Sequence, residues 1–142
     1  MKRIYVNEKW CLGCHLCEYY CAYANSDERD MVKALKGMKI HPRIQIEEKN
    51  GISFAVSCRH CTEPLCVKSC ITGALSRADG VIQIDSGKCV GCYTCILACP
   101  YGAITTGEGT AVQKCELCTK NAVAVPACVA GCPNQAIVYE ER

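Results

Sequence analysis

Short runs of alternating apolar and polar residues recur along the chain, as in "RIYV", "ISFAV" and "AIVYE". Successive side chains of a strand face opposite sides, so each run predicts a half-buried β-strand. The run "ALSRADGVIQI" contains Asp79-Gly80, a dipeptide typical of a tight hairpin turn. Strands are predicted at residues 3–6, 43–48, 52–56, 74–84 (a hairpin), 103–106, 110–114 and 136–140.

Residues 22–42 follow neither this strand pattern nor the spacing of the cysteines. Within them, "DERDMVKALKG" predicts a short helix, because acidic residues come first and Gly37 ends the run. The segment is interpreted as surface structure, with contact to a partner protein as the alternative.

The chain has 16 cysteines among its 142 residues, and they fall into four similar motifs. Motifs one and three have the spacing C-x2-C-x2-C-x3-C, and motifs two and four widen only the central gap. This spacing is typical of bacterial iron–sulfur proteins, in which the fourth cysteine binds a different cluster from the first three. The motifs are Cys11, Cys14, Cys17 and Cys21; Cys58, Cys61, Cys66 and Cys70; Cys89, Cys92, Cys95 and Cys99; and Cys115, Cys118, Cys128 and Cys132.

A cysteine content this high is typical either of a secreted disulfide scaffold or of an intracellular metal protein. The first residues include Lys2 and Arg3 but no apolar stretch of an export signal, so we expect reduced thiols and a cytoplasmic location. Closely spaced cysteine triplets also fit disulfide geometry poorly. Zinc ribbons join two C-x2-C groups across a longer spacer, whereas here a third cysteine follows directly. Four [4Fe–4S] clusters are therefore the predicted cofactors, with zinc as the alternative.

The order of strands indicates which motifs share a domain. Motifs two and three occur with strands in the order strand, motif, hairpin, motif, strand, which is the order in a bacterial-type two-cluster ferredoxin. Motifs one and four occur with the remaining strands. The predicted fold class is therefore α+β, with two such ferredoxin units, one inserted into the other. The predicted domains are residues 1–50 plus 110–142 for the outer unit and 51–109 for the inner unit.

In such a unit each motif gives three thiolates to one cluster and its fourth thiolate to the other. The pairing of motifs then predicts four sets of ligands, which we name quartets A to D. Quartet A is Cys11, Cys14, Cys17 and Cys132; quartet B is Cys21, Cys115, Cys118 and Cys128; quartet C is Cys58, Cys61, Cys66 and Cys99; quartet D is Cys70, Cys89, Cys92 and Cys95.

Two further groups of residues lie near the cysteines. His15 and His60, inside motifs one and two, are interpreted as packing or surface residues rather than as donors to cluster sulfur. Six basic residues are interpreted as partly balancing the negative charge of the clusters: Lys9, Arg59, Lys68, Lys88, Lys114 and Lys120.

The sequence has none of the usual features of a substrate site. Four thiolates on each cluster leave no iron with an open position, and neither a Gly-rich phosphate loop nor a nucleophile–base pair is evident. The formal net charge of +2 does not suggest nucleic-acid binding, and no stretch of eighteen apolar residues suggests membrane insertion. We therefore expect an electron-transfer protein that is not itself an enzyme.

The whole chain resembles the four-cluster ferredoxin-like electron-transfer subunits found beside hydrogenases and beside molybdopterin enzymes such as dimethyl sulfoxide reductase and formate dehydrogenase. Four segments look most similar to the small ferredoxin subunit of anaerobic nickel carbon monoxide dehydrogenase. They are "NEKWCLGCHLCEYYCAYANS", "CRHCTEPLCVKSCITGAL", "CVGCYTCILACPYGAI" and "KCELC". The chain departs from this pattern at Ala22 and Ile71, which stand where proline follows the fourth cysteine in motifs three and four.

The resemblance implies a protein that carries electrons from carbon monoxide dehydrogenase to a hydrogenase, an NAD(P) reductase or another acceptor protein. The alternative within the same class is an electron-transfer subunit of a formate dehydrogenase or hydrogenase complex. A zinc-stabilised interaction module is the alternative from a different class.

Overall fold

The computed structural model describes residues 1–37, 39–121 and 123–142. Met38, in the 22–42 segment, and Ala122, in the long gap of motif four, lie outside these residues. The helices are α1 (Leu16–Ala24), α2 (Met31–Leu35), α3 (Leu65–Lys68), α4 (Thr94–Ala98) and α5 (Ala127–Ala130), with a short 3-10 turn at Thr119–Asn121. The strands are β1 (Arg3–Val6), β2 (Gln45–Lys49), β3 (Ile52–Val56), β4 (Leu75–Ala78), β5 (Val81–Ile84), β6 (Ile104–Thr106), β7 (Val112–Lys114) and β8 (Ile137–Glu140).

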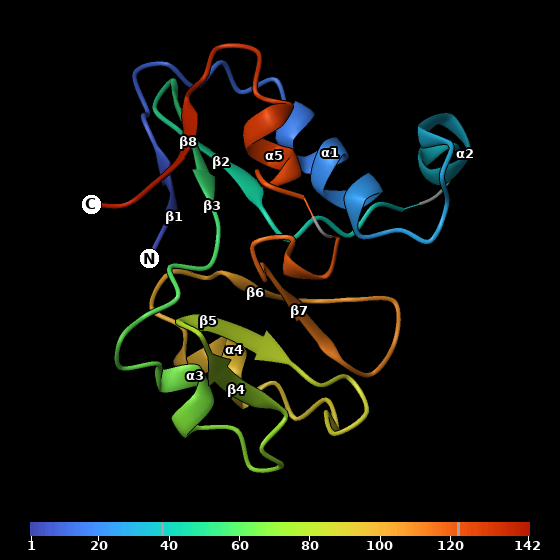
Figure 1. Cartoon of the computed structure of the whole chain (residues 1–142), viewed down its shortest axis with the longest axis vertical. Helices are drawn as coiled ribbons and strands as arrows, with labels where there is room; N and C mark the ends of the chain where they lie inside the picture. The colour runs from blue at the N-terminus through green and yellow to red at the C-terminus, as the bar shows by residue number, and fades with distance from the viewer. Residues whose placement is uncertain (38, 122) are drawn as a thin grey trace.

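These elements form two halves, one above the other in Figure 1. The upper half contains β1, β2, β3 and β8 with helices α1 and α5, and the lower half contains β4 to β7 with α3 and α4. Within the described residues every sheet is an antiparallel pair: β1–β8, β2–β3, β4–β5 and β6–β7. A two-stranded hairpin is only marginally stable alone. The small sheets therefore depend on packing around the cysteine motifs.

The first and last strands pair with each other in the upper half. Ile4 lies opposite Tyr139 and Val6 lies opposite Ile137, and Ile4 and Ile137 are both buried. This pairing brings motif four, near the end of the sequence, beside motif one. Helices α1 and α5, which carry cysteines of these two motifs, also pack against each other.

Strand β3 does not lie where the sequence analysis expected it. Residues 52–56 were assigned to the inner unit, but β3 pairs with β2, with Ile46 opposite Ala55. The strands are joined by Asn50-Gly51, whose φ angles of 51° and 75° are both positive, as in a two-residue hairpin turn. Asn-Gly is a strong hairpin signal, and here it decides the partner of β3. The expected boundary between residues 50 and 51 falls inside this hairpin.

Strand β7 also pairs differently from the prediction. It was assigned to the outer unit, yet it pairs with β6, with Ile104 opposite Lys114. The buried side chain of Val112 explains this placement, because it packs in the lower core with Leu75 and Ile84. The lower half therefore extends through residue 114 before the chain returns to the upper half.

Two other local predictions are confirmed. The hairpin at 74–84 forms as β4 and β5, with positive φ angles at Asp79 and Gly80. Helix α2 lies within the predicted 27–37 run, and the side chain of Asp30 caps it by accepting a hydrogen bond from the N–H of Val32 at 2.9 Å. In Figure 1 this helix projects away from the rest of the upper half.

Cysteines make up much of the two hydrophobic cores. The upper core extends into the lower half and contains buried cysteines together with Ile4, Ile44, Ala55 and Ile137. The lower core contains Cys66 and Cys95 among aliphatic residues from β4 to β7. Because thiols replace aromatic bulk in both cores, metal binding would add directly to the free energy of folding.

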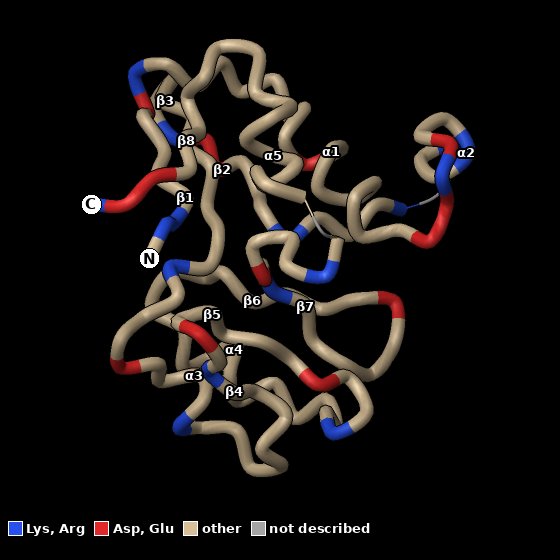
Figure 2. The backbone as a smooth tube through the Cα atoms, in the orientation of Figure 1, with Lys and Arg blue, Asp and Glu red and all other residues tan. Residues whose placement is uncertain are grey.

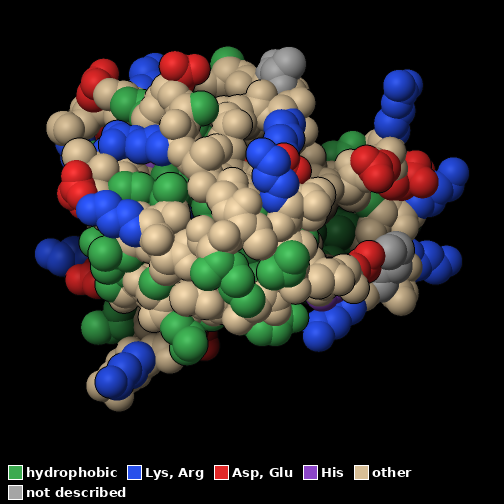
Figure 3. Space-filling model, turned by 90° about the horizontal axis from the view of Figure 1, so that it is seen from below, with side chains coloured by type: hydrophobic (Ala, Val, Ile, Leu, Met, Phe, Trp, Pro, Cys, Tyr) green, Lys and Arg blue, Asp and Glu red, His purple; other side chains and the backbone are tan. Residues whose placement is uncertain are grey.

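The surface carries a mixture of charges. Basic and acidic residues are interspersed over both halves (Figure 2). Viewed from below, apolar side chains form several patches across the lower part of the face, and basic side chains lie mostly near its margins (Figure 3). Within the described residues, no helix combines the length and the apolar character needed to cross a bilayer.

Candidate iron–sulfur sites

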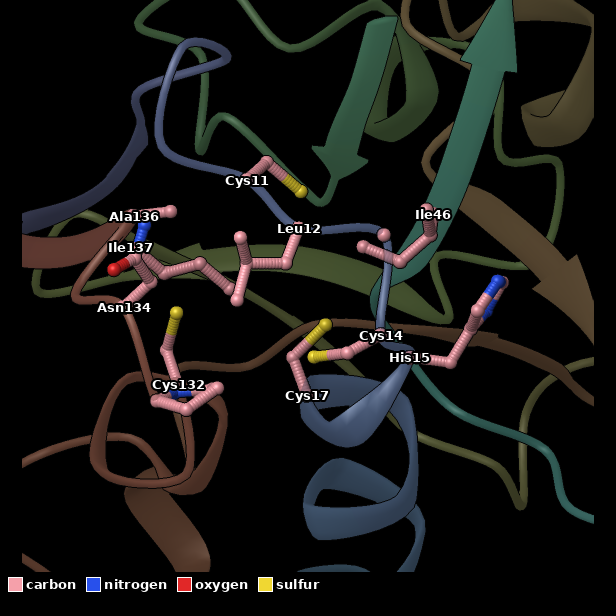
Figure 4. A pocket seen from close by; sticks show the side chains of 12 residues that line it. Cys11, Leu12, Cys14, His15, Cys17, Ile46, Cys132, Asn134, Ala136 and Ile137 are labelled. Carbon is pink, nitrogen blue, oxygen red and sulfur yellow. The ribbon is translucent and has the colours of Figure 1, made fainter. Parts of the chain in front are cut away.

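The four cysteines of quartet A line one small cavity. Three of them come from motif one, on and before α1, while Cys132 follows α5 near the end of the chain. Figure 4 shows the sulfur atoms of Cys14, Cys17 and Cys132 turned toward the same space. The rest of the lining is largely apolar and includes Ile46 and Ile137. Thiols from opposite ends of the chain are thus brought together around one largely apolar cavity.

The cysteines of quartet D line a second small cavity in the lower half. Burial opposes ionisation of Cys70, but hydrogen bonds from the backbone N–H of Leu75 and from Thr72 outweigh it and lower the pKa of this thiol to about 7. The hydroxyl of Thr94 lies 3.5 Å from the sulfur of Cys92 and lowers the pKa of that thiol as well. Several donors therefore favour thiolate at this site.

The cysteines of quartet B lie deep in the upper core. Burial is the main cause that raises the pKa of Cys115 to about 12, and the nearby thiol of Cys21 adds to the rise. Burial likewise raises the pKa of Cys128, with further contributions from Cys115, Cys21 and Cys118. Each of these thiols thus lies within the electrostatic reach of the others.

Quartet C occupies the region between the two halves. Burial raises the pKa of Cys58, and the thiols of Cys99 and Cys61 add to this rise. The pKa of Cys66 is raised by burial and then by Cys58 and Cys99. Cys99, the last cysteine of motif three, therefore lies among the first three cysteines of motif two.

The four quartets follow one another along the molecule. The thiol of Cys17 in quartet A influences Cys128 in quartet B, and Cys58 in quartet C influences Cys115 in quartet B. In the lower core, Cys66 of quartet C packs in the same cluster of residues as Cys95 of quartet D. The spatial order is therefore A, B, C, D.

Backbone N–H groups point at several of the sulfur atoms. The N–H of Arg43 donates to the sulfur of Cys21 at 3.2 Å, that of Leu117 to Cys115 at 3.4 Å, and that of His60 to Cys58 at 3.5 Å. Such bonds stabilise thiolate and tune the potential of a bound cluster. The donors around quartets B and C thus fit iron–sulfur clusters.

The loops of motifs one and three share a backbone shape. Gly13 and His15 have φ angles of 65° and 62°, and Gly91 and Tyr93 have angles of 71° and 60°. Left-handed residues of this kind turn successive N–H groups toward one concave space, which is an arrangement found at iron–sulfur sites. A Cβ atom on Gly91 would also lie 2.7 Å from the carbonyl oxygen of Thr110. Glycine is therefore required at this position by both φ and space.

His60 is a buried ring with one nitrogen unused. The sequence analysis interpreted it as a packing or surface residue, and it packs inside the protein. It is 0% exposed, and its Nδ1 accepts a hydrogen bond from the N–H of Ile82 at 3.0 Å. Burial and the charges of Lys114 and Arg3 lower its pKa to about 3, so the ring is neutral and its proton lies on Nε2. Nε2 has no acceptor among the described residues. The sulfur atoms of a cluster at the neighbouring quartet C would supply one.

Two charged residues beside quartet B are also buried. Lys114 is 0% exposed, and Glu116 is 2% exposed and bonded to Arg43 at 3.1 Å and to Lys120 at 3.3 Å. The sequence analysis included Lys114 among six basic residues without separating it from the others, and it did not single out Glu116. Val112, Lys114 and Glu116 follow a period of two, so the buried position of Val112 was a signal that the other two share its face.

The spacing of the thiols differs from that of a site for a single ion. No three His, Cys, Asp or Glu side chains in residues 1–37, 39–121 and 123–142 converge as the ligands of one metal ion do. In a [4Fe–4S] cluster each thiolate binds a different iron, so its ligands stand apart from one another.

Paired cysteine motifs whose thiols converge across the fold define an iron–sulfur protein of the ferredoxin type. Comparison with known families agrees, because residues 50–142 match the 4Fe-4S dicluster domain. The chain belongs to this family of [4Fe–4S]-binding proteins.

Curated relatives are named for electron transfer. The "Iron-sulfur protein" of Rhodospirillum rubrum is 37% identical, with 94% of this chain and 79% of that protein aligned. The "Electron transport protein HydN" of Escherichia coli is 34% identical over 93% of this chain and 83% of its own. The "Thiosulfate reductase electron transfer subunit PhsB" of Salmonella typhi is 32% identical over 94% and 72%. The chain is thus an iron–sulfur electron-transfer protein similar to these.

A solved structure shares the fold. The active site complex BamBC of benzoyl coenzyme A reductase has a chain that aligns with all of this one and with 80% of its own length, at a TM-score of 0.54 and 20% identity. This likeness concerns the fold alone.

Proposed function

We propose that the protein binds four [4Fe–4S] clusters, one at each of quartets A to D, and transfers electrons between two partner proteins. When bound, such clusters accept and release one electron at a time. The chain's own contribution is to hold sixteen thiolates, to exclude water from quartets B and C, and to direct N–H groups at sulfur.

The position of Cys132 is the observation that carries this proposal. It lies in one cavity with Cys11, Cys14 and Cys17, although more than a hundred residues separate it from them. Crossed ligation of this kind is what the C-x2-C-x2-C-x3-C-P spacing predicts for two-cluster proteins. A disulfide scaffold or a zinc ribbon has no need to exchange fourth cysteines between motifs.

We further propose two nested ferredoxin-type units whose boundaries follow the hairpins. The outer unit then comprises residues 1–56 and 115–142, and the inner unit comprises residues 57–114. The division is supported by the pairing of β1 with β8 and by the pairing of β6 with β7.

The two ends of the series A, B, C, D are the proposed points of electron entry and exit. Cys14 of quartet A and Cys92 of quartet D are exposed, whereas three of the four cysteines of quartet B are buried. We place the electron donor at the outer unit, because α1 of that unit leads into the segment that contains the projecting helix α2. An exposed apolar residue of α2, Val32, is available for such a contact.

Carbon monoxide dehydrogenase is the proposed donor, and a hydrogenase, an NAD(P) reductase or another protein is the proposed acceptor. The support is the resemblance of the four motif regions to the ferredoxin subunit of that system. The reduced thiols that clusters need are consistent with a cytoplasmic site of action. A subunit of a formate dehydrogenase, hydrogenase or other reductase complex is the second candidate. The similarity to PhsB, an electron transfer subunit of thiosulfate reductase, favours this kind of assembly.

Metal analysis of the anaerobically purified protein tests the cluster count. We expect about sixteen iron and about sixteen acid-labile sulfide per chain, and a brown colour. Eight irons or fewer after full reconstitution, or stoichiometric zinc in a colourless sample, would overturn the four-cluster proposal.

Electron transfer from purified enzymes tests the partner. The protein is mixed with carbon monoxide dehydrogenase under carbon monoxide, and the bleaching of its visible absorbance is followed. Formate dehydrogenase with formate and hydrogenase with hydrogen serve as comparisons. Faster reduction by carbon monoxide dehydrogenase is expected, and the reverse ranking would favour the second candidate.

A further inference from the structure

Lys114 is a buried ammonium group without a carboxylate partner. Its Nζ donates hydrogen bonds to the carbonyl oxygen of Ile82 and, at 2.6 Å, to that of Cys115. Among the residues that the structure describes, no Asp or Glu oxygen lies within 4.0 Å of this nitrogen, since none of the ion pairs involves it. Two neutral carbonyl groups are therefore its hydrogen-bond acceptors.

This arrangement is energetically unfavourable in the polypeptide without bound clusters. Removing an ammonium group from water costs several kcal/mol unless an opposite charge is close. The nearest buried carboxylate in the sequence, Glu116, is already bonded to Arg43, to Lys120 and to the N–H of Ile84. The negative charge that balances Lys114 must therefore come from something other than these side chains.

The position of Lys114 shows where that charge lies. Burial raises the pKa of Cys58 and Cys66 in quartet C and of Cys115 in quartet B, and in all three cases the Lys114 ammonium opposes the rise. Lys114 also directly precedes Cys115 in the sequence and binds its carbonyl group. It thus lies within electrostatic reach of both central quartets, at the passage between the two halves of the molecule.

We propose that Lys114 is the fixed counter-charge of the two central clusters and that it raises their reduction potentials relative to a neutral side chain at the same place. This inference rests on the proposed function. Reduction adds one electron to a cluster and removes one from its donor, so the reduced cluster is more negative by one unit. A nearby positive charge favours that form. Lys114 exchanges no electron and contributes only its positive charge.

The consequence for electron transfer concerns quartets B and C together. None of their eight cysteines is exposed and five are buried. Burial in a medium of low dielectric disfavours the more highly charged reduced state. Lys114 offsets this effect at both quartets. Electrons that enter at either end then meet no large rise in energy in the middle of the series.

The test uses the complete holoprotein and its Lys114→Met variant. Anaerobic redox titrations are followed by paramagnetic resonance, and the signals of quartets B and C are identified with Cys118→Ser and Cys61→Ser. We expect the midpoint potentials of quartets B and C to be lower in Lys114→Met by at least about 59 mV. For a one-electron couple, this shift corresponds to a tenfold fall in the ratio of reduced to oxidised cluster at a fixed potential. The potentials of quartets A and D should move less.

Two control variants separate charge from structure. Lys114→Arg keeps the charge and should stay close to the wild-type potentials. Lys120→Met removes a charge that also lies beside quartet B but is exposed to solvent, so screening should leave the potentials of B and C nearly unchanged. Lys114→Gln retains a hydrogen-bond donor without the charge, and it supplies the same comparison if the methionine variant loads less iron.

The outcomes are distinct. Equal potentials in wild type, Lys114→Met and Lys114→Gln would overturn the inference, as would an equal fall in Lys114→Arg. Iron and sulfide are counted in every sample, and a wild-type protein with fewer than four clusters would instead contradict the proposed function.

Discussion

The carboxylate of Glu116 accepts a hydrogen bond from the backbone N–H of Ile84 at 2.8 Å and so joins segments 32 residues apart. Ile84 ends β5, whose second edge has no strand beside it in the described structure. The N–H of Ile82 on that edge binds His60, and its carbonyl group binds Lys114. Three side chains therefore satisfy a buried strand edge that would otherwise carry unpaired polar groups.

Replacing Glu116 should destabilise the protein strongly. Glu116→Gln keeps an acceptor for Ile84 but leaves the partly buried guanidinium of Arg43 without its carboxylate. Breaking a buried ion pair costs about 3 kcal/mol or more. Anaerobic denaturant unfolding of the holoprotein, followed by loss of visible absorbance, measures this difference.

The control is Glu108→Gln, at an exposed position where a change below about 0.5 kcal/mol is expected. Equal unfolding midpoints for the two variants would show that the Glu116 network contributes little to stability.

Variants of Cys132 and Cys14 should alter the same cluster. Both thiols line the quartet A cavity, although one lies near each end of the sequence. Cys132→Ser and Cys14→Ser should therefore change the same component of the paramagnetic resonance spectrum and reduce the iron content by similar amounts. Cys92→Ser is the matched control, because it should change a different component, that of quartet D. If Cys132→Ser and Cys14→Ser changed different components, the crossed assignment of ligands would be wrong.

Alanine at position 91 should weaken cluster binding at quartet D. Its Cβ atom would meet the carbonyl oxygen of Thr110, and φ at this residue is 71°. A left-handed residue with a side chain costs about 1 kcal/mol or more before any clash is counted. Thermal loss of the visible absorbance should begin at a lower temperature in Gly91→Ala. Gly109→Ala, where a Cβ atom meets nothing within 4 Å and φ is not positive, should behave like wild type.

Thiols should differ in reactivity once iron has been removed by a chelator. Cys70 has a pKa of about 7, whereas that of Cys115 is raised to about 12. Only thiolate reacts with iodoacetamide, so the labelling rate of Cys70 should rise as pH increases from 6 to 8 and then level off. Cys115 should label slowly throughout this range. Mass spectrometry of timed samples measures both rates, and urea is the control that should abolish the difference. Equal rates without urea would contradict the prediction.

Individual strands could be predicted from the sequence because their signals are local. The alternation in "RIYV" and "ISFAV" depends only on which residues face a core, and the structure has strands at both places. Likewise Asp79-Gly80 specifies its own turn, since both residues adopt positive φ. Helix α2 also followed from local chemistry, with Asp30 as its cap.

The pairing of strands could not be predicted from the alternation of apolar and polar residues. A period of two places a side chain on a face but does not name the neighbouring strand, so β3 was assigned by its closeness to motif two. The Asn50-Gly51 turn carries the missing information for β2 and β3. For β7 no comparable turn exists, and its partner follows only from the packing of Val112 in the lower core.

The burial of individual charged residues was the second feature that could not be predicted from the sequence. Six basic residues near cysteines look equivalent in the sequence, yet Lys114 is fully buried while Lys88 and Lys120 are exposed. The difference arises because β7 turns Lys114 toward β5 of another hairpin. Such a contact depends on the assembled fold.

The crossing of the chain between quartets has a consequence for synthesis on the ribosome. A nascent chain that has emerged as far as Cys99 already contains all the thiols of quartets C and D. Quartet B is complete only after Cys128, and quartet A only after Cys132. With the proposed ligand sets, the lower half can acquire its iron before motif four has been made, whereas the cysteines of motif one must be kept reduced and free of wrong metals until Cys132 has been added.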